Sequence, residues 1–387
     1  MNLKEKDSLY VANTYARFPI TLKEGKGSLV FDDEGKEYID LATGIAVNSF
    51  GYCDSVWENA VTMQLNTLQH ASNLYYTEPC VKLAELICLK TGMKKVFFSN
   101  SGAEANECAI KVARKYAANK KGSDYNQIIT LENSFHGRTI TTLAATGQEV
   151  FHKDFLPLTE GFCYVEANNC EELIKTVKNG KIAAIMFETV QGEGGVNPLS
   201  AEFVKTIFDL AEKYDILTIS DEVQTGNGRT GQLYGYMNYS VTPDIFTTAK
   251  GLGGGLPLGA TVLGDKVKDV LTAGDHGSTF GGNPVACAGA ITVINRIDDK
   301  LLSEVREKSE YIINALNKTK GVKSVTGKCF MLGIETEKDA AEVISKCMEK
   351  GVLVIKAKQK VRLLPALNIP FDTLKKAINI LCEVIGE

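Results

Sequence analysis

The stretch Ile216-Leu-Thr-Ile-Ser-Asp-Glu-Val-Gln-Thr-Gly226 decides the fold class of this chain. Its first five residues are mostly apolar and β-branched, and a short run of this kind favours a β-strand. Asp221 follows where that strand should end, and open α/β sheets bind ligands beyond the carboxyl ends of their strands. A carboxylate at such a place is also a frequent helix cap or loop anchor, so this stretch alone leaves its role open.

Similar strands alternate with helical patterns on both sides of this stretch. Residues 182–189 are nearly all apolar, which is typical of a strand that is covered on both faces. Further strands are expected at 95–98, 128–131 and 245–248, and amphipathic helices at 103–119 and 200–214. This alternation predicts an α/β fold in which a mostly parallel sheet is flanked by helices.

The two ends of the chain have a different character. A hairpin is expected from 28–31 and 37–40, and strands at 325–335, 352–355 and 361–364 are mixed with helices at 340–350 and 372–385. We therefore expect a small α+β domain built from both ends. The predicted boundaries are 1–45 for its N-terminal segment, 46–284 for the large domain and 285–387 for its C-terminal part.

Composition excludes several classes of protein. The 387 residues include 43 basic and 47 acidic side chains, a net charge of −4 that does not suggest a nucleic-acid-binding protein. No apolar run approaches the ~18 residues of a membrane helix. The ten cysteines include no Cys-x-x-Cys pair, and the first ten residues carry no apolar targeting segment, so we expect reduced thiols, no metal site and a cytoplasmic protein.

Three further stretches carry residues suited to chemistry. Ser99–Glu107 leads from a predicted strand into a predicted helix. The free N–H groups at the start of that helix could bind a phosphate, or the residues there could be an ordinary helix cap. Lys250 follows another predicted strand and is flanked by small residues. It is either an enclosed amine that acts as a nucleophile or a solvated lysine before a flexible loop. Gly274–Pro284 leads hydroxyls and glycines into a helix, a second possible anion site.

Five motifs occur in an order that resembles the class III aminotransferases. They are Ser134-Phe-His-Gly-Arg-Thr139, Gln191-Gly-Glu-Gly-Gly195, Asp221–Gly226 with Gly228-Arg-Thr-Gly231, Ala249-Lys-Gly-Leu-Gly-Gly-Gly255, and His276–Pro284. The resemblance runs from Asn13 to Arg362 and is closest to the acetylornithine branch. It implies the fold-type I architecture of pyridoxal-phosphate transferases, with the large domain binding the cofactor.

The resemblance implies a role for each matched cofactor residue. Lys250 would carry the cofactor and move a proton, and Asp221 would pair with its pyridine nitrogen. Phe135 and Val223 would pack on the two ring faces, and Gln224 would reach the phenolic oxygen. The phosphate would rest on Ser101, Gly102 and Ala103, with Thr279 reaching it from the partner subunit of a homodimer with shared active sites.

The substrate residues follow from the same resemblance. Arg138 would hold the α-carboxylate of the amino donor, and Arg362 a carboxylate of 2-oxoglutarate or glutamate. Glu193 would pair with Arg362, and Ser278 would lie beside the substrate. Glu188 either supports this site or is a structural carboxylate. The implied reaction passes the 5-amino group of N2-acetylornithine to 2-oxoglutarate in arginine biosynthesis.

Several alternatives stay open from the sequence. The same chemistry could act on ornithine, succinylornithine or another ω-amine. A nicotinamide-dependent oxidoreductase would explain the glycines, but Leu256 stands where its fingerprint needs a sixth-position glycine. A non-catalytic regulator would not need an enclosed lysine. The chain also departs from the family pattern at Tyr52–Ser55, at Thr189 and at 364–367, which leaves specificity near the first stretch less secure.

Overall fold

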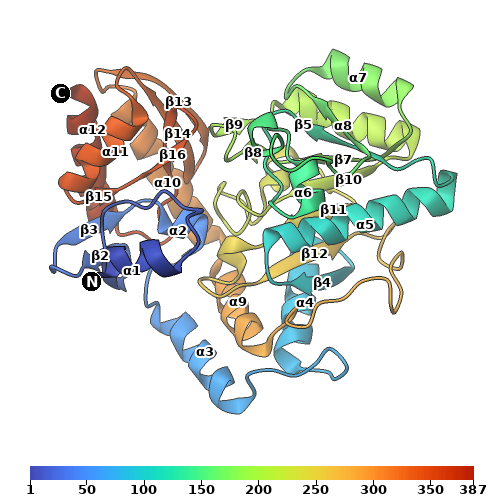
Figure 1. The fold of residues 1–387 in the computed structure, drawn as a ribbon, viewed down its shortest axis with the longest axis horizontal. Helices are drawn as coiled ribbons and strands as arrows, with labels where there is room; N and C mark the ends of the chain where they lie inside the picture. The colour runs from blue at the N-terminus through green and yellow to red at the C-terminus, as the bar shows by residue number, and fades with distance from the viewer.

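The computed structural model describes residues 1–387, and its largest element is a seven-stranded sheet in the order β4-β12-β11-β10-β7-β5-β6 (Figure 1). The strands are β4 Lys95–Ser99, β5 Gln127–Leu131, β6 Phe162–Val165, β7 Ile182–Phe187, β10 Leu217–Asp221, β11 Ile245–Thr248 and β12 Gly259–Leu263. The strands from β11 to β6 are parallel, and only β12 runs antiparallel to its neighbours β11 and β4. The predicted mostly parallel sheet is therefore confirmed.

Helices cover both faces of this sheet because successive side chains of a strand point to opposite sides. In β7, Ala184 and Met186 pack with α5 (Gly102–Lys121), whereas Ile185 and Phe187 pack with α7 (Cys170–Asn179) and α8 (Ala201–Tyr214). All six residues of β7 are buried, as the apolar run predicts. Figure 1 shows α5 on one side of the sheet and α7 and α8 on the other.

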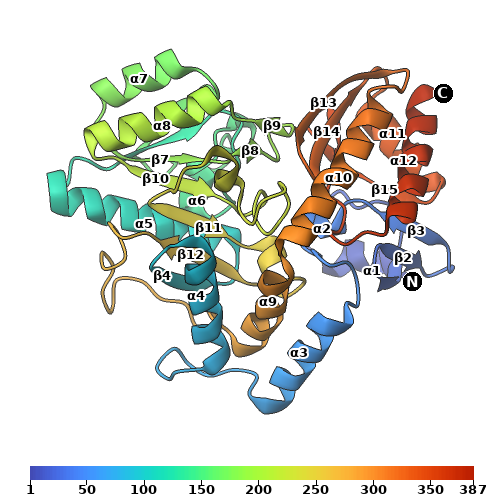
Figure 2. The ribbon, with the colours of Figure 1, turned by 180° about the vertical axis from the view of Figure 1, so that it is seen from behind.

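The two chain ends lie side by side at the other end of the molecule (Figures 1 and 2). The hairpin of β2 and β3 extends into a sheet β1-β2-β3-β15, and a second sheet has the order β13-β14-β17-β16. Their bounds are β1 Leu22–Lys26, β2 Leu29–Asp32, β3 Glu37–Asp40, β13 Val322–Lys328, β14 Met331–Thr336, β15 Val352–Leu353, β16 Ile355–Ala357 and β17 Lys360–Leu363. Helices α10 (Asp299–Leu316), α11 (Ala340–Glu349) and α12 (Phe371–Gly386) pack against them. The domain boundaries given above stay a prediction.

One expected strand was wrong. The stretch 325–335 belongs to the hairpin of β13 and β14, because the chain turns back at Cys329, which has a positive φ, and Phe330. The apolar residues on both sides of that turn made the two strands resemble a single one.

A third group of helices lies below the large sheet in Figure 1. Helix α9 (Pro284–Arg296) packs against α3 (Ser55–Thr67) and α4 (Glu78–Thr91), so this helix contacts residues assigned to the large domain. The short remaining elements are α1 Leu3–Tyr10, α2 Thr43–Ala46, α6 Ile140–Ala145, β8 Val190–Gln191, β9 Asn197–Pro198 and the 3-10 turns η1 Glu149–Phe151, η2 Gly235–Tyr239 and η3 Lys250–Leu252. No helix is both long and apolar enough to cross a bilayer.

Candidate active site

A cavity of about 490 Å³ opens where the parallel strands of the large sheet end. Its wall includes Phe135 from the segment after β5, Glu188 directly after β7, Asp221 at the end of β10 and Lys250 from the segment after β11. The carboxyl ends of parallel strands share one edge of a sheet, so residues far apart in sequence meet there. The fold itself thus brings the predicted lysine and aspartate into one cavity.

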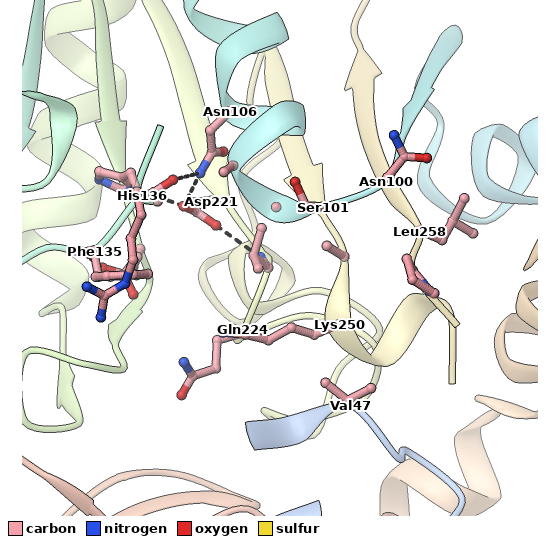
Figure 3. Close-up of a pocket in the computed structure, with 18 of the residues that line it drawn as sticks. Val47, Asn100, Ser101, Asn106, Phe135, His136, Asp221, Gln224, Lys250 and Leu258 are labelled. Carbon is pink, nitrogen blue, oxygen red and sulfur yellow. Dashed lines mark hydrogen bonds and ion pairs between the residues drawn. The ribbon is translucent and has the colours of Figure 1, made fainter. Parts of the chain in front are cut away.

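Asp221 is held by three hydrogen bonds in the floor of the cavity (Figure 3). Its Oδ2 accepts from Nδ1 of His136 at 2.7 Å and from Nδ2 of Asn106 at 2.8 Å, and its Oδ1 accepts from the N–H of Val223 at 3.0 Å. Asn106 is itself oriented by the hydroxyl of Thr247, which donates to its Oδ1. Asp221 is 3% exposed, so this network fixes a carboxylate that water barely reaches.

Lys250 lies in a strained backbone position at the cavity wall. Its φ is +46°, in the left-handed region that non-glycine residues rarely adopt, and such strain is concentrated at functional sites. Asn227 holds the preceding residue in place by donating to the carbonyl of Ala249 at 3.2 Å. Burial of the side chain lowers the pKa of Lys250, which raises the share of neutral amine at pH 7.

The N-terminus of α5 fits a phosphate group. Ser101 caps the helix by accepting from the N–H of Glu104, which leaves the N–H groups of Gly102 and Ala103 without partners inside the helix. All three residues line the cavity. A Cβ on Gly102 would lie 2.7 Å from Cγ1 of Val223, so only glycine lets the helix start this close to the segment after Asp221. With Lys250 opposite, the residues present suit a phosphate-bearing aldehyde such as pyridoxal phosphate.

A second charged group lies beside the cavity, at the junction with the small domain. Arg362 of β17 is 2% exposed and donates from Nη1 to Oε1 of Glu193 at 2.6 Å and to Oε1 of Gln224 at 3.0 Å. Burial works to raise the pKa of Glu193, but the adjacent guanidinium outweighs it and holds that pKa below its ordinary value. Gln224 lines the cavity, yet its amide faces this ion pair, and its predicted contact with a phenolic oxygen stays a prediction.

Arg138 is a cation of the cavity wall that forms no ion pair. Its guanidinium lies 5.5 Å from the ring centre of Phe135 and 4.9 Å from that of Phe151, and no carboxylate lies within 4 Å. Both rings orient the charge without neutralising it. An exposed guanidinium held this way is free to bind a carboxylate in bidentate fashion.

Glu188 closes the wall behind Phe135. Its carboxylate accepts from the N–H of Phe135 at 2.9 Å and from that of Gly192 at 3.1 Å, joining two of the sequence motifs. Burial raises the pKa of Glu188 to about 7. It lies within the site, and its contacts are those of a residue that holds two loops.

Four of the predicted site residues do not line this cavity: Glu193 and Arg362 form the ion pair beside it, and Ser278 and Thr279 lie in the segment before α9. Thr279 is exposed, and Ser278 reaches the cavity only through Asn100, whose Nδ2 donates to the Ser278 hydroxyl at 3.3 Å. Sequence reasoning had also assigned no role to His136 or Asn106, although both lie inside quoted motifs. A polar side chain such as Asn106 on the buried face of a helix was the available clue.

The stretch Tyr52–Ser55, where the family pattern is missing, has structural partners of its own. The hydroxyl of Tyr52 donates to Asp40 at 2.8 Å, and Asp54 caps α3 and lies 2.9 Å from Arg296. None of its residues lines the main cavity. These contacts account for the local residues without giving them a part in the chemistry.

Known proteins match this chain over nearly its whole length. Residues 10–385 match the family described as aminotransferase class-III. The chain is 47% identical over 387 residues to the acetylornithine aminotransferase of Haemophilus ducreyi, covering 100% of this chain and 98% of that protein. The acetylornithine aminotransferase of Methanocaldococcus jannaschii is 43% identical over 392 residues, with the same coverage.

Solved structures agree with the sequence relatives. The ornithine aminotransferase of Toxoplasma gondii superposes with a TM-score of 0.94 at 31% identity, covering 99% of this chain and 94% of that one. The N-acetylornithine aminotransferase of Stenotrophomonas maltophilia gives 0.86 at 33% identity, covering 99% and 98%. The fold is thus that of these transferases, and the chain belongs to the class III aminotransferases.

Proposed function

We propose that the protein transfers the 5-amino group of N2-acetyl-L-ornithine to 2-oxoglutarate, giving N-acetyl-L-glutamate 5-semialdehyde and L-glutamate in arginine biosynthesis. One observation carries the proposal: Lys250 and Asp221 share a cavity that has the free guanidinium of Arg138 on its wall and the masked guanidinium of Arg362 beside it. The acetylornithine aminotransferases named above, at 47% and 43% identity, support this substrate.

Lys250 is placed to move a proton between two carbon atoms during the reaction. When bound, pyridoxal phosphate supplies an aldehyde that takes up amines and a ring that accepts electrons from the carbon losing a proton. Nζ of Lys250 would take the proton from that carbon and return it to the former aldehyde carbon, two bonds away across the shared nitrogen, which needs the neutral form of the amine. Burial lowers the pKa of Lys250, which favours that neutral form.

Asp221 provides a fixed negative charge at the opposite end of the cavity. Two side chains and one backbone N–H donate to it, so its carboxylate is held in one orientation. A carboxylate in that state keeps a partner nitrogen protonated. The chain thereby stabilises the charge that develops when Lys250 removes a proton.

The two arginines explain how one site accepts two unlike substrates. An amino donor whose reacting amine is far from its α-carboxylate would place that carboxylate on Arg138, with Glu193 still covering Arg362. A dicarboxylate such as 2-oxoglutarate would bind Arg362 in place of Glu193. The exchange of one carboxylate for another keeps the buried guanidinium paired in both half-reactions.

The substrate assignment is tested by kinetic discrimination. We expect kcat/KM for N2-acetylornithine to exceed that for ornithine by at least about tenfold, the effect of 1.4 kcal/mol in transition-state binding. Ornithine is the second candidate, since the ornithine aminotransferase of Toxoplasma gondii superposes on 99% of this chain. A clear preference for ornithine, succinylornithine or another ω-amine would replace the proposed donor and leave the transaminase chemistry in place.

We infer that two copies of the chain form a dimer with shared active sites. Leu74, Tyr75, Tyr76 and Phe280 are 86%, 72%, 99% and 60% exposed, and a cluster of exposed apolar side chains is typical of an interaction surface. Their two segments touch, because Asn73 donates from its side chain to the carbonyls of Ser278 and Gly281. A second copy covering this surface would receive the exposed Thr279 at its own cavity.

Mixed dimers test this arrangement. Lys250→Ala and Thr279→Ala would each be nearly inactive alone, but hybrids would carry one site with both residues intact. If subunits of the two variants exchange at random, about half of the dimers are hybrids, and each hybrid has one intact site out of two. Mixing should therefore restore about a quarter of wild-type activity. Recovery near zero, or a fully active monomer in sedimentation, contradicts shared sites.

The ten free cysteines also support a reducing compartment, and we propose the cytoplasm.

A further inference from the structure

Arg229 is a fully buried cation that none of the steps above uses. It belongs to the motif Gly228–Gly231, is 2% exposed and has no carboxylate within 4 Å. Burial lowers the pKa of Arg229 to about 9, so the side chain remains charged at pH 7. A buried guanidinium without an acidic partner costs free energy, and its contacts must offset that cost.

Those contacts all lie on the small domain. Nη1 of Arg229 donates to the carbonyls of Phe330 and Pro365, and its own carbonyl accepts from the N–H of Phe330 at 3.0 Å. Phe330 directly precedes β14, and Pro365 follows two residues after β17. Arg229 therefore joins one shared end of these two paired strands.

Arg362 lies three residues before Pro365, one of the two residues that Arg229 contacts. It pairs with Gly333 across β14 and β17, in the register that places Phe330 next to Pro365. The chain beyond β17 is also held by the hydroxyl of Thr43, which donates to the carbonyl of Leu364 at 2.6 Å. The strand that carries Arg362 is thus anchored at one end by the loop that continues from Asp221 and Gln224.

The loop around Arg229 is shaped for this contact. A Cβ on Gly228 would lie 2.9 Å from Cδ1 of Leu367, and one on Gly231 would lie 2.6 Å from Sγ of Cys329. Both glycines also have positive φ. The close approach to the small domain therefore depends on two residues without side chains, which frame the arginine.

We propose that Arg229 is a positioning residue that sets the distance between Arg362 and the Asp221 loop, and so the affinity of the site for the carboxylate of the amino acceptor. This inference rests on the proposed role of Arg362 as the carboxylate clamp. Arg229 touches no substrate. It acts by holding β17 in the register in which the Arg362 guanidinium reaches both Glu193 and Gln224.

The test compares Arg229→Met and Arg229→Lys with Arg306→Met. Arg306 is the matched control, because its Nη1 donates to the carbonyl of Gly231 on the same loop but has no contact with β17. The readouts are KM for 2-oxoglutarate, KM for N2-acetylornithine, the melting temperature, and the Kd of glutarate for cofactor-free protein by calorimetry. Glutarate is a dicarboxylate that cannot react.

We expect Arg229→Met to raise KM for 2-oxoglutarate and the Kd of glutarate about tenfold, with KM for N2-acetylornithine changed less than about twofold. Arg229→Lys, which keeps the charge and reaches one carbonyl, should show about threefold, and Arg306→Met no change. A lower melting temperature with unchanged glutarate binding, or equal rises in both KM values, overturns the proposal. If the wild type ignores N2-acetylornithine but Arg229→Met still weakens glutarate, the proposed substrate fails and this inference stands.

Discussion

Nδ1 of His136 lies 2.7 Å from Oδ2 of Asp221, and both side chains are buried. A carboxylate can only accept, so the proton of this bond belongs to His136. Its other nitrogen, Nε2, is buried without a partner, which leaves Asp221 as the reason for the ring's orientation. His136 therefore holds the carboxylate of Asp221, the negative charge on which the proposed chemistry depends, in position.

Replacing His136 by Phe should slow transamination without emptying the cavity of cofactor. A hydrogen bond to a charged group contributes about 1.5–3 kcal/mol, which corresponds to roughly 10–100-fold in kcat. Stopped-flow absorbance of the first half-reaction measures this rate. The control is His152→Phe, since His152 is also buried but contacts the carbonyl of Leu143 outside the cavity. Equal loss in both variants would mean that the effect is structural.

Asp221→Asn should keep the cofactor bound but lower kcat by about three orders of magnitude, or roughly 4 kcal/mol of transition-state stabilisation. The neutral amide keeps the shape of the side chain and removes its charge. Asp40→Asn is the matched control, because Asp40 is also 3% exposed and accepts three hydrogen bonds away from the cavity. It should lower the melting temperature and leave kcat within about threefold. Near-normal turnover in Asp221→Asn contradicts the assignment.

Glu193→Ala should leave Arg362 uncovered in the resting protein. Dicarboxylates would then no longer compete with a carboxylate of the chain, and we expect KM for glutamate to fall several-fold, by about 1 kcal/mol in binding. 2-Oxoglutarate should also inhibit the first half-reaction at lower concentration. Initial rates over a grid of both substrates measure both effects. Unchanged inhibition would show that Glu193 does not mask the arginine.

Glu188 should make the stability of the cofactor-free protein depend on pH. Its folded pKa of about 7 lies above the ordinary 4.5, so the folded state keeps a proton that the unfolded state releases between these values. The free energy of unfolding should therefore fall as pH rises from about 4.5 to about 7, and then level off. Urea unfolding at several pH values measures this slope. Glu188→Gln should flatten it, and parallel curves for both proteins would contradict the raised pKa.

The sequence predicted the sheet and the cavity walls because both depend on local patterns. A buried strand can be predicted from a short apolar run such as Ile182–Phe187. Asp221 and Lys250 can be placed at the edge of the sheet because each directly follows such a run. The hairpin of β13 and β14 was missed, because the two-residue turn at Cys329 and Phe330 contains no proline or glycine that would mark a break between strands. Among contacts between the domains, the resemblance predicted the pair of Glu193 and Arg362, but local patterns predicted none.

Arg229 illustrates that limit most clearly. Its motif was visible, but its partners Phe330 and Pro365 lie more than 100 residues further along the chain. His136 and Asn106 were likewise quoted without a role, because only the fold brings both beside Asp221. Residues whose function depends on a distant partner need the structure to be assigned.

The central claim is that Lys250 is the lysine of a pyridoxal-phosphate site, and borohydride reduction followed by peptide mass spectrometry tests it most directly. The protein loaded with one equivalent of cofactor should become yellow, and reduction should fix the cofactor on the peptide that contains Lys250 and on no other. The lowered pKa of this one enclosed amine is the physical reason for the selectivity. Label spread over exposed lysines, or colourless protein without label on Lys250, would contradict the account.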